Sequence, residues 1–172
     1  MSEPRNALSD PIFRDVPNDI DESWSLGIIF GGMVSSTLLI ARSYKEAADR
    51  LVDRAVKDDD VHEVGWPVLF LYRHAIELYI KEIVRPKELH HRLLVDEFVD
   101  VVRARFRQEL PGWVVARLRE FAEWDPGSFA FRYAHGRKGG ITFPEESWAD
   151  LLQARKVVDE LTGVFERAME RE

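Results

Sequence analysis

The sequence predicts an all-α fold, an up-and-down helical bundle of four to five helices with a short hairpin or ordered loop before the last helix. Apolar residues recur at helical spacing along most of the 172 residues, whereas an alternating strand pattern is limited to one short segment. The connections between the periodic segments are short, which favours helices packed directly on one another. With 45% hydrophobic residues, the chain has enough apolar surface for the core of a single domain.

The N-terminal part is expected to form an extended arm followed by a long helix. Prolines at positions 4, 11 and 17 lie among polar residues and favour an arm over residues 1–18, which leaves residues 19–172 as the single domain. Asp19 or Asp21 is then placed to cap a long helix over residues 20–56, in which Gly31 and Gly32 can introduce a kink. Its apolar stripe consists of Trp24, Ile28, Val34, Leu38, Ala41, Tyr44, Ala48, Leu51 and Ala55.

The second helix is expected over residues 66–84, after a turn in the acidic stretch "KDDDVHEVG" at residues 57–65. Pro67 is tolerated in the first turn of such a helix, and Pro86 follows its end. One face carries the core stripe Val68, Tyr72, Ala75, Ile76, Tyr79 and Ile83. Arg73 and Glu77 lie at the boundary of this stripe, and His74 and Lys81 fall on the far side.

The remaining helices are expected over residues 91–109, over residues 113–124 and after Pro144. The segment between the last two contains Asp-Pro-Gly, the alternating "SFAFRY" and three glycines, which predicts a short hairpin or an ordered loop. Glu145 and Glu146 fit the first turn of the last helix, where the helix dipole favours anions. Its stripe consists of Trp148, Leu151, Leu152, Val158, Leu161, Val164 and Phe165.

Charge and cysteine content narrow the possible functions. With 24 Lys and Arg against 31 Asp and Glu, the net charge of −7 argues against a free-standing nucleic-acid binder, although a local basic patch is compatible with it. The absence of cysteine excludes disulfides, thiolate chemistry and cysteine-based zinc sites. No secretory signal precedes the first helix, and the apolar stretch at residues 26–41 is too short to span a bilayer, so we expect a cytoplasmic protein without membrane contact.

Three segments together resemble a known family. "VLFLYRHAIELYIKEIV", "HHRLLVDEFVDVV" and "EWDPGSFAFRYAHGRKGG", within residues 67–140, are similar to bacterial HEPN proteins. The resemblance implies a small helical bundle from toxin–antitoxin, phage-defence or RNA-processing systems. Many HEPN proteins are metal-independent ribonucleases, often dimers, that use an Arg and a His separated by a short spacer near the last bundle helix.

Two Arg/His pairs are the candidates for that catalytic role. Arg85 and His90 have the family's spacing, but they lie in the link after the second helix, next to Pro86. Arg132 and His135 lie just before the last helix, but only two residues separate them. In either pair the His would exchange a proton with an RNA hydroxyl, and the Arg would stabilise charge developing on phosphorus.

The charged residues of the second helix have two interpretations. Arg73 and Glu77 can form an i,i+4 pair at the core margin, which contributes about 0.2 to 0.5 kcal/mol when exposed. Alternatively, they meet Asp125 or Arg132 in a buried network that holds the "DPGSFAFRY" loop against the bundle. Either role is architectural.

The Gly-rich stretch "AHGRKGG" also has two interpretations. Arg137 and Lys138 can contact phosphate, because the glycines let the backbone approach a ligand, or they can belong to a solvated turn. The five histidines show no metal-ligand spacing, so neither a metal nor a cofactor is expected.

Two functions follow. The first is a HEPN-like protein of a bacterial conflict or RNA-associated system that acts by binding a protein partner or itself as a homodimer, without strong catalysis. The second is a metal-independent endoribonuclease whose Arg/His pair is completed across a homodimer, with RNA as the substrate.

Overall fold

The computed structural model describes residues 36–88, 91–107, 109–136, 139–143 and 145–170, together with Phe13 and Ile28. The chain divides into two units, residues 1–35 and residues 36–172, and the helices belong to the second. The arm expected over residues 1–18 therefore lies outside the described residues, apart from Phe13.

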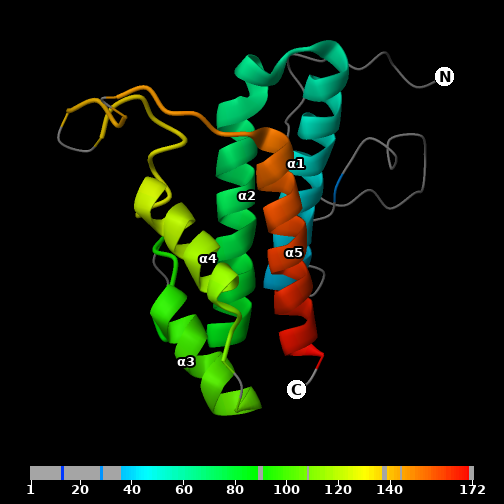
Figure 1. Ribbon diagram of the computed structural model, residues 1–172, viewed down its shortest axis with the longest axis vertical. Coiled ribbons are helices and arrows are strands. Elements are labelled where there is room, and N and C mark those ends of the chain that lie inside the picture. The colour runs from blue at the N-terminus through cyan, green and yellow to red at the C-terminus, as the bar shows by residue number, and fades with distance from the viewer. Residues whose placement is uncertain are drawn as a thin grey trace. The chain divides into compact units, whose positions relative to one another are not determined.

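The described residues form five helices and no strand, which confirms the predicted all-α fold class (Figure 1). In chain order these are α1 (Thr37–Asp58), α2 (Val61–Val84), α3 (Val95–Phe106), α4 (Gly112–Trp124) and α5 (Leu151–Met169). Within the described part of the segment between α4 and α5, one antiparallel bridge joins His135 to Ile141. Apart from this bridge, the described part of that segment has no regular secondary structure.

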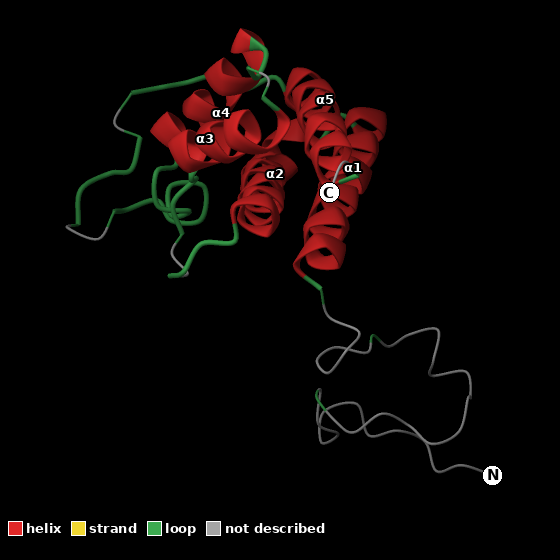
Figure 2. Ribbon diagram, turned by 90° about the horizontal axis from the view of Figure 1, so that it is seen from below, coloured by secondary structure: helices red, strands yellow, loops and turns green. Residues whose placement is uncertain are grey.

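Helix α2 lies in the middle of the bundle. Helices α1 and α5 pack on one side of it and α3 and α4 on the other, as the view along the bundle shows (Figure 2). Helix α1 runs in the opposite direction to α2 and α5 (Figure 1). Because neighbours cover α2 on both sides, polar residues in its middle have little access to water, whereas His62 and Glu63 in its first turn are exposed.

The first helix begins later than predicted, at Thr37. Ser36 has extended backbone angles, and its hydroxyl oxygen accepts a hydrogen bond from the backbone N–H of Leu39 at 3.0 Å. A serine in this position satisfies one of the unpaired N–H groups at a helix start. The prediction of a continuous helix over residues 20–56 is wrong, since the chain is also not helical at Ile28.

The turn between α1 and α2 is shorter than predicted and comprises Asp59 and Asp60. Asp59 adopts the left-handed conformation (φ 57°), and its N–H bonds to the carbonyl of Ala55. Aspartate tolerates this conformation better than most residues. Helix α2 therefore already begins at Val61, which places Pro67 in its second turn, where the missing N–H removes one helical hydrogen bond.

The contact between α1 and α2 depends on small side chains. Ala41, Ala48 and Ala55 are at most 1% exposed and share one face of α1. Alanine lets two helix backbones approach closely, and the larger core residues of α2 fill the remaining space. All six residues predicted for the stripe of α2 are buried.

Phe165 of α5 joins three helices. Its ring stacks on Tyr79 of α2, with 5.5 Å between the ring centroids, and meets Phe98 of α3 edge to face at 5.3 Å. All three side chains are at most 1% exposed. The core is therefore continuous from α5 through α2 to α3.

The last helix also begins later than predicted. Asp150 caps it by accepting a hydrogen bond from the N–H of Gln153 at 3.0 Å, so Glu145 and Glu146 precede the helix and are not in its first turn. Trp148 and Leu152, predicted for its stripe, are 84% and 56% exposed. Of the helices described, none is long and apolar enough to cross a membrane.

Candidate functional site

Arg73 is fully buried in the middle of the bundle and is held by three acceptors. Its Nε donates to the carbonyl of Asp125 at 3.0 Å, its Nη2 to the carbonyl of His91 at 2.8 Å, and its Nη1 to the Glu77 carboxylate. Its exposed fraction is 0%, so the placement of Arg73 at the stripe boundary underestimated its burial. The guanidinium fastens α2 to the segment before α3 and to the end of α4.

Glu77, which is 1% exposed, accepts hydrogen bonds from both Arg73 and Lys81. Burial alone would raise the pKa of Glu77, but the hydrogen bond from Lys81 and the charges of Arg73 and Lys81 outweigh it and lower the pKa below its ordinary value. The carboxylate is therefore ionised and paired on both sides.

Asp125 organises the loop after α4. Its Oδ1 accepts hydrogen bonds from the backbone N–H groups of Phe129 and Ala130, the latter at 2.8 Å. Ser128, which directly precedes Phe129, has a positive φ of 54°. This conformation is uncommon, and the two hydrogen bonds to Asp125 help to hold it. The Oδ2 of Asp125 accepts no hydrogen bond from the residues that the structure describes, and it lies 3.6 Å from Nε of Arg73. We call Arg73, Glu77, Lys81 and Asp125 the Arg73 cluster.

Arg132, proposed for the same network, lies elsewhere. Its guanidinium donates to the carbonyl of Ser128 and lies over the rings of Phe70 and Tyr133, 5.2 and 5.5 Å from their centroids. The structure thus brings together three of the four residues expected in the network, Arg73, Glu77 and Asp125, while Arg132 packs on aromatic rings beside them.

Aromatic side chains gather where the loop meets α2 and α4. Phe143 is central: its ring centroid lies 5.7 Å from that of Trp66, 5.6 Å from that of Trp124 and 5.9 Å from that of Phe131. We call these four residues the aromatic surface. Trp66 and Trp124 remain 53% and 43% exposed, so the surface is open to solvent.

A hollow of about 720 Å³ lies between the end of α4 and the loop. Its walls include Trp124, Phe129, Ile141 and Phe143, and Glu123 and Asp125 also line it. Its volume is in the range of ligand sites in proteins. Asp125 holds the first turn of the loop that lines the hollow, and Arg73 binds the carbonyl of Asp125.

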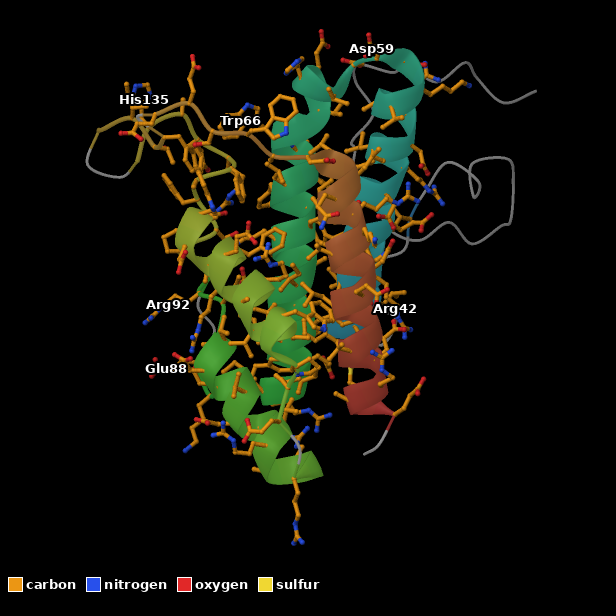
Figure 3. The ribbon with its side chains drawn as sticks, in the orientation of Figure 1. Arg42, Asp59, Trp66, Glu88, Arg92 and His135 are labelled. Atoms are coloured by element: carbon orange, nitrogen blue, oxygen red, sulfur yellow. The ribbon has the colours of Figure 1, made fainter. Side chains whose placement is uncertain are left out.

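Of the four candidate catalytic residues, the structure describes Arg85, Arg132 and His135. Arg85 ends α2 in the left-handed conformation (φ 50°), and its Nε donates to the carbonyl of Glu82, whereas His90 lies outside the described residues. His135 is exposed at the outer end of the loop, far from Glu88 and Arg92, which flank His90 in the sequence (Figure 3).

The described residues include neither of the candidate phosphate contacts and no group of metal ligands. Arg137 and Lys138, the candidate phosphate contacts, lie outside the described residues. Within the part of the chain that is described, no three His, Asp or Glu side chains are close enough to hold a metal ion.

The sequence interpretation missed a second buried polar network, between α1, α2 and α5. The hydroxyl of Tyr72 donates to Asp49 at 2.7 Å, and Lys45 bridges Asp49 and Asp159. Burial and the Asp49 carboxylate raise the pKa of Tyr72 well above its ordinary value, so the hydroxyl stays protonated. The sequence contains one signal for this network: Asp49 directly follows Ala48, an alanine of the apolar stripe of the first helix, so a polar partner for Asp49 inside the bundle could be expected.

Comparisons with known proteins give no further assignment. No family model matches the chain, and neither the curated proteins nor the solved structures provide a match.

Proposed function

We propose that this chain is a HEPN-like protein of a bacterial conflict or RNA-associated system that works by binding a protein partner or a second copy of itself. The resemblance over residues 67–140 supplies the family, and an all-α bundle is the architecture that the resemblance implies. The proposal assigns association, and not strong catalysis, as the activity.

The aromatic surface carries this proposal. Tryptophan and other aromatic residues are enriched at protein interfaces, where they contribute a large share of the binding energy. Here two tryptophans, each about half exposed, flank Phe143 and contact its ring. Aromatic side chains that already pack on one another lose little conformational entropy on binding, which favours association.

The state of the charged residues supports the same function. Arg73, Glu77 and Asp125 are at most 1% exposed, so they cannot reach a substrate without opening the bundle. Arg132 and His135 belong to the loop, and Arg132 is already engaged with Ser128 and two aromatic rings.

Tryptophan substitutions test the association. Trp124→Ser removes one side chain of the aromatic surface, and Trp113→Ser is a matched control on the same helix with the same exposure of 43%. We expect sedimentation velocity or affinity capture to show an assembly that persists in Trp113→Ser and is lost in Trp124→Ser. An assembly that both variants retain, or a chain that binds neither itself nor another protein, would contradict the proposal.

A ribonuclease assay tests the catalytic alternative. The wild-type protein is incubated with RNA in excess EDTA, next to the Arg132→Ala/His135→Ala and His90→Ala variants. We expect no cleavage above background. Cleavage that survives EDTA and disappears in either variant would establish the metal-independent endoribonuclease instead.

A further inference from the structure

We infer that the hollow beside α4 receives the guanidinium of an arginine side chain presented by the protein partner. This inference rests on the proposed function, because it names the chemistry by which the aromatic surface would bind its partner. Three features of the hollow support it.

The first feature is the shape and character of the walls. Trp124, Phe129 and Phe143 present aromatic rings, and the face of an aromatic ring carries negative charge density that attracts a cation. A guanidinium is planar and weakly hydrated, so it stacks on such faces more readily than an ammonium group does. Ile141 adds an apolar wall for the aliphatic part of the side chain.

The second feature is the charge of the lining. The hollow has two carboxylates, the exposed Glu123 at its rim and the buried Asp125 in its floor. No Lys or Arg occurs among the lining residues that the structure describes. Asp125 is fully buried and its Oδ2 lies 3.6 Å from Nε of Arg73, so the exposed carboxylate of Glu123 is the one that an incoming cation would meet. A positively charged ligand complements this lining.

The third feature is that the same loop already holds a guanidinium on aromatic rings. Arg132 lies over Phe70 and Tyr133 at 5.2 and 5.5 Å, within the distance at which a cation is attracted to a ring. Trp124, Phe129 and Phe143, which line the hollow, are aromatic as well, and an incoming guanidinium would have the same type of contact with them.

The test uses a small probe and its neutral analogue. N-acetyl-arginine amide is titrated into the full chain, and the side-chain indole signals of the tryptophans are followed by NMR. N-acetyl-citrulline amide, which has nearly the same shape without the charge, is the matched control. We expect a saturable shift of the Trp124 signal with the arginine probe at about millimolar concentration, no saturation with the citrulline probe, and an unchanged Trp113 signal.

Variants locate the site without disturbing the fold. Glu123→Gln removes the rim charge from an exposed residue and should weaken binding of the arginine probe about two- to fivefold. Glu120→Gln, on the same helix but away from the hollow, should leave binding unchanged. Equal binding of both probes, no saturation, or an identical affinity in Glu123→Gln would overturn the inference.

The two proposals fail in different ways. If the arginine probe does not bind but Trp124→Ser still abolishes assembly, the association function stands and the arginine assignment is wrong. If the probe saturates the hollow but no assembly depends on Trp124, the hollow is a site for small cations and the association function is wrong.

Discussion

At the scale of single residues, the most consequential side chain is Arg73. A buried charge is tolerated when it is paired and its hydrogen-bonding groups are satisfied, and Arg73 meets both conditions through Glu77 and the carbonyls of His91 and Asp125. Removing the arginine takes away one of the two cations that pair with Glu77 and the cation that lies 3.6 Å from the buried Asp125 carboxylate.

Arg73→Leu is therefore expected to lower the free energy of unfolding by about 3 to 5 kcal/mol, because breaking a buried pair costs far more than losing an exposed one. Urea denaturation measures the effect. Arg50→Leu is the control, since Arg50 pairs with Glu46 at 78% side-chain exposure, and it should change stability by about 0.5 kcal/mol or less. Similar losses in the two variants would refute the role given to Arg73.

His74 is expected to make stability depend on pH. Burial lowers its pKa below the ordinary value of 6.5, with further lowering by the charges of Arg73 and Lys81 and an opposite effect from Glu77. The unfolded chain then binds a proton at higher pH than the folded chain does. The contribution of neutral His74 to the free energy of unfolding is therefore complete above the ordinary pKa and is lost as the pH falls below it.

The expected loss from His74 is at most about 1.4 kcal/mol per pH unit. Unfolding free energies measured between about pH 7.5 and 5.5 test this. His74→Phe keeps an aromatic ring against Tyr44 and Phe70 but cannot titrate, so its pH dependence should be weaker. A variant with the wild-type pH dependence would show that another group is responsible.

Part of the Arg73 cluster could be predicted from the sequence. The i,i+4 spacing and the aspartate after α4 were sufficient to suggest that Arg73, Glu77 and Asp125 meet. The full burial of Arg73 was not predictable from the helical wheel of α2, because it results from α3 and α4 covering the face opposite α1. The carbonyl of His91 could not be predicted either, since a backbone acceptor has no residue signature.

At the scale of elements, the close contact of α1 and α2 depends on alanines. Ala48→Leu adds volume at a position with 0% exposure and should destabilise the protein by about 1 to 3 kcal/mol. Its neighbour Ala47 is exposed, so Ala47→Leu should change stability by about 0.5 kcal/mol or less. Thermal unfolding of both variants distinguishes overpacking from a general effect of leucine on the helix.

Helix identities were predictable from periodicity, whereas several helix ends were not. Ser36 and Asp150 cap α1 and α5, but each lies inside a longer apolar pattern that the sequence continues on both sides. Trp148 and Leu152 match the period of α5, yet both are exposed, because periodicity alone does not show whether a neighbour covers the residue. Capping side chains decide the boundaries in both cases.

At the scale of the whole molecule, Phe165 makes the helices of residues 36–172 mutually dependent. Phe165→Ala should cost about 3 to 5 kcal/mol, since the cavity affects α2, α3 and α5 at once. Leu152→Ala, at an exposed position of the same helix, is the control and should cost about 0.5 kcal/mol. Unfolding followed by circular dichroism and by tryptophan fluorescence should give coincident transitions, and separate ones would show that the helices unfold independently.

The Arg73 cluster also determines the register of the bundle. Two apolar helix faces can slip past one another by a turn, about 5.4 Å, and still place methyl groups against methyl groups. The guanidinium does not permit such a slip, because its N–H groups meet the carbonyls of His91 and Asp125, which belong to other segments, in one alignment only. A purely hydrocarbon interior would allow several neighbouring alignments of the helices. The buried arginine selects one of them and, with it, one position for the start of the loop after α4.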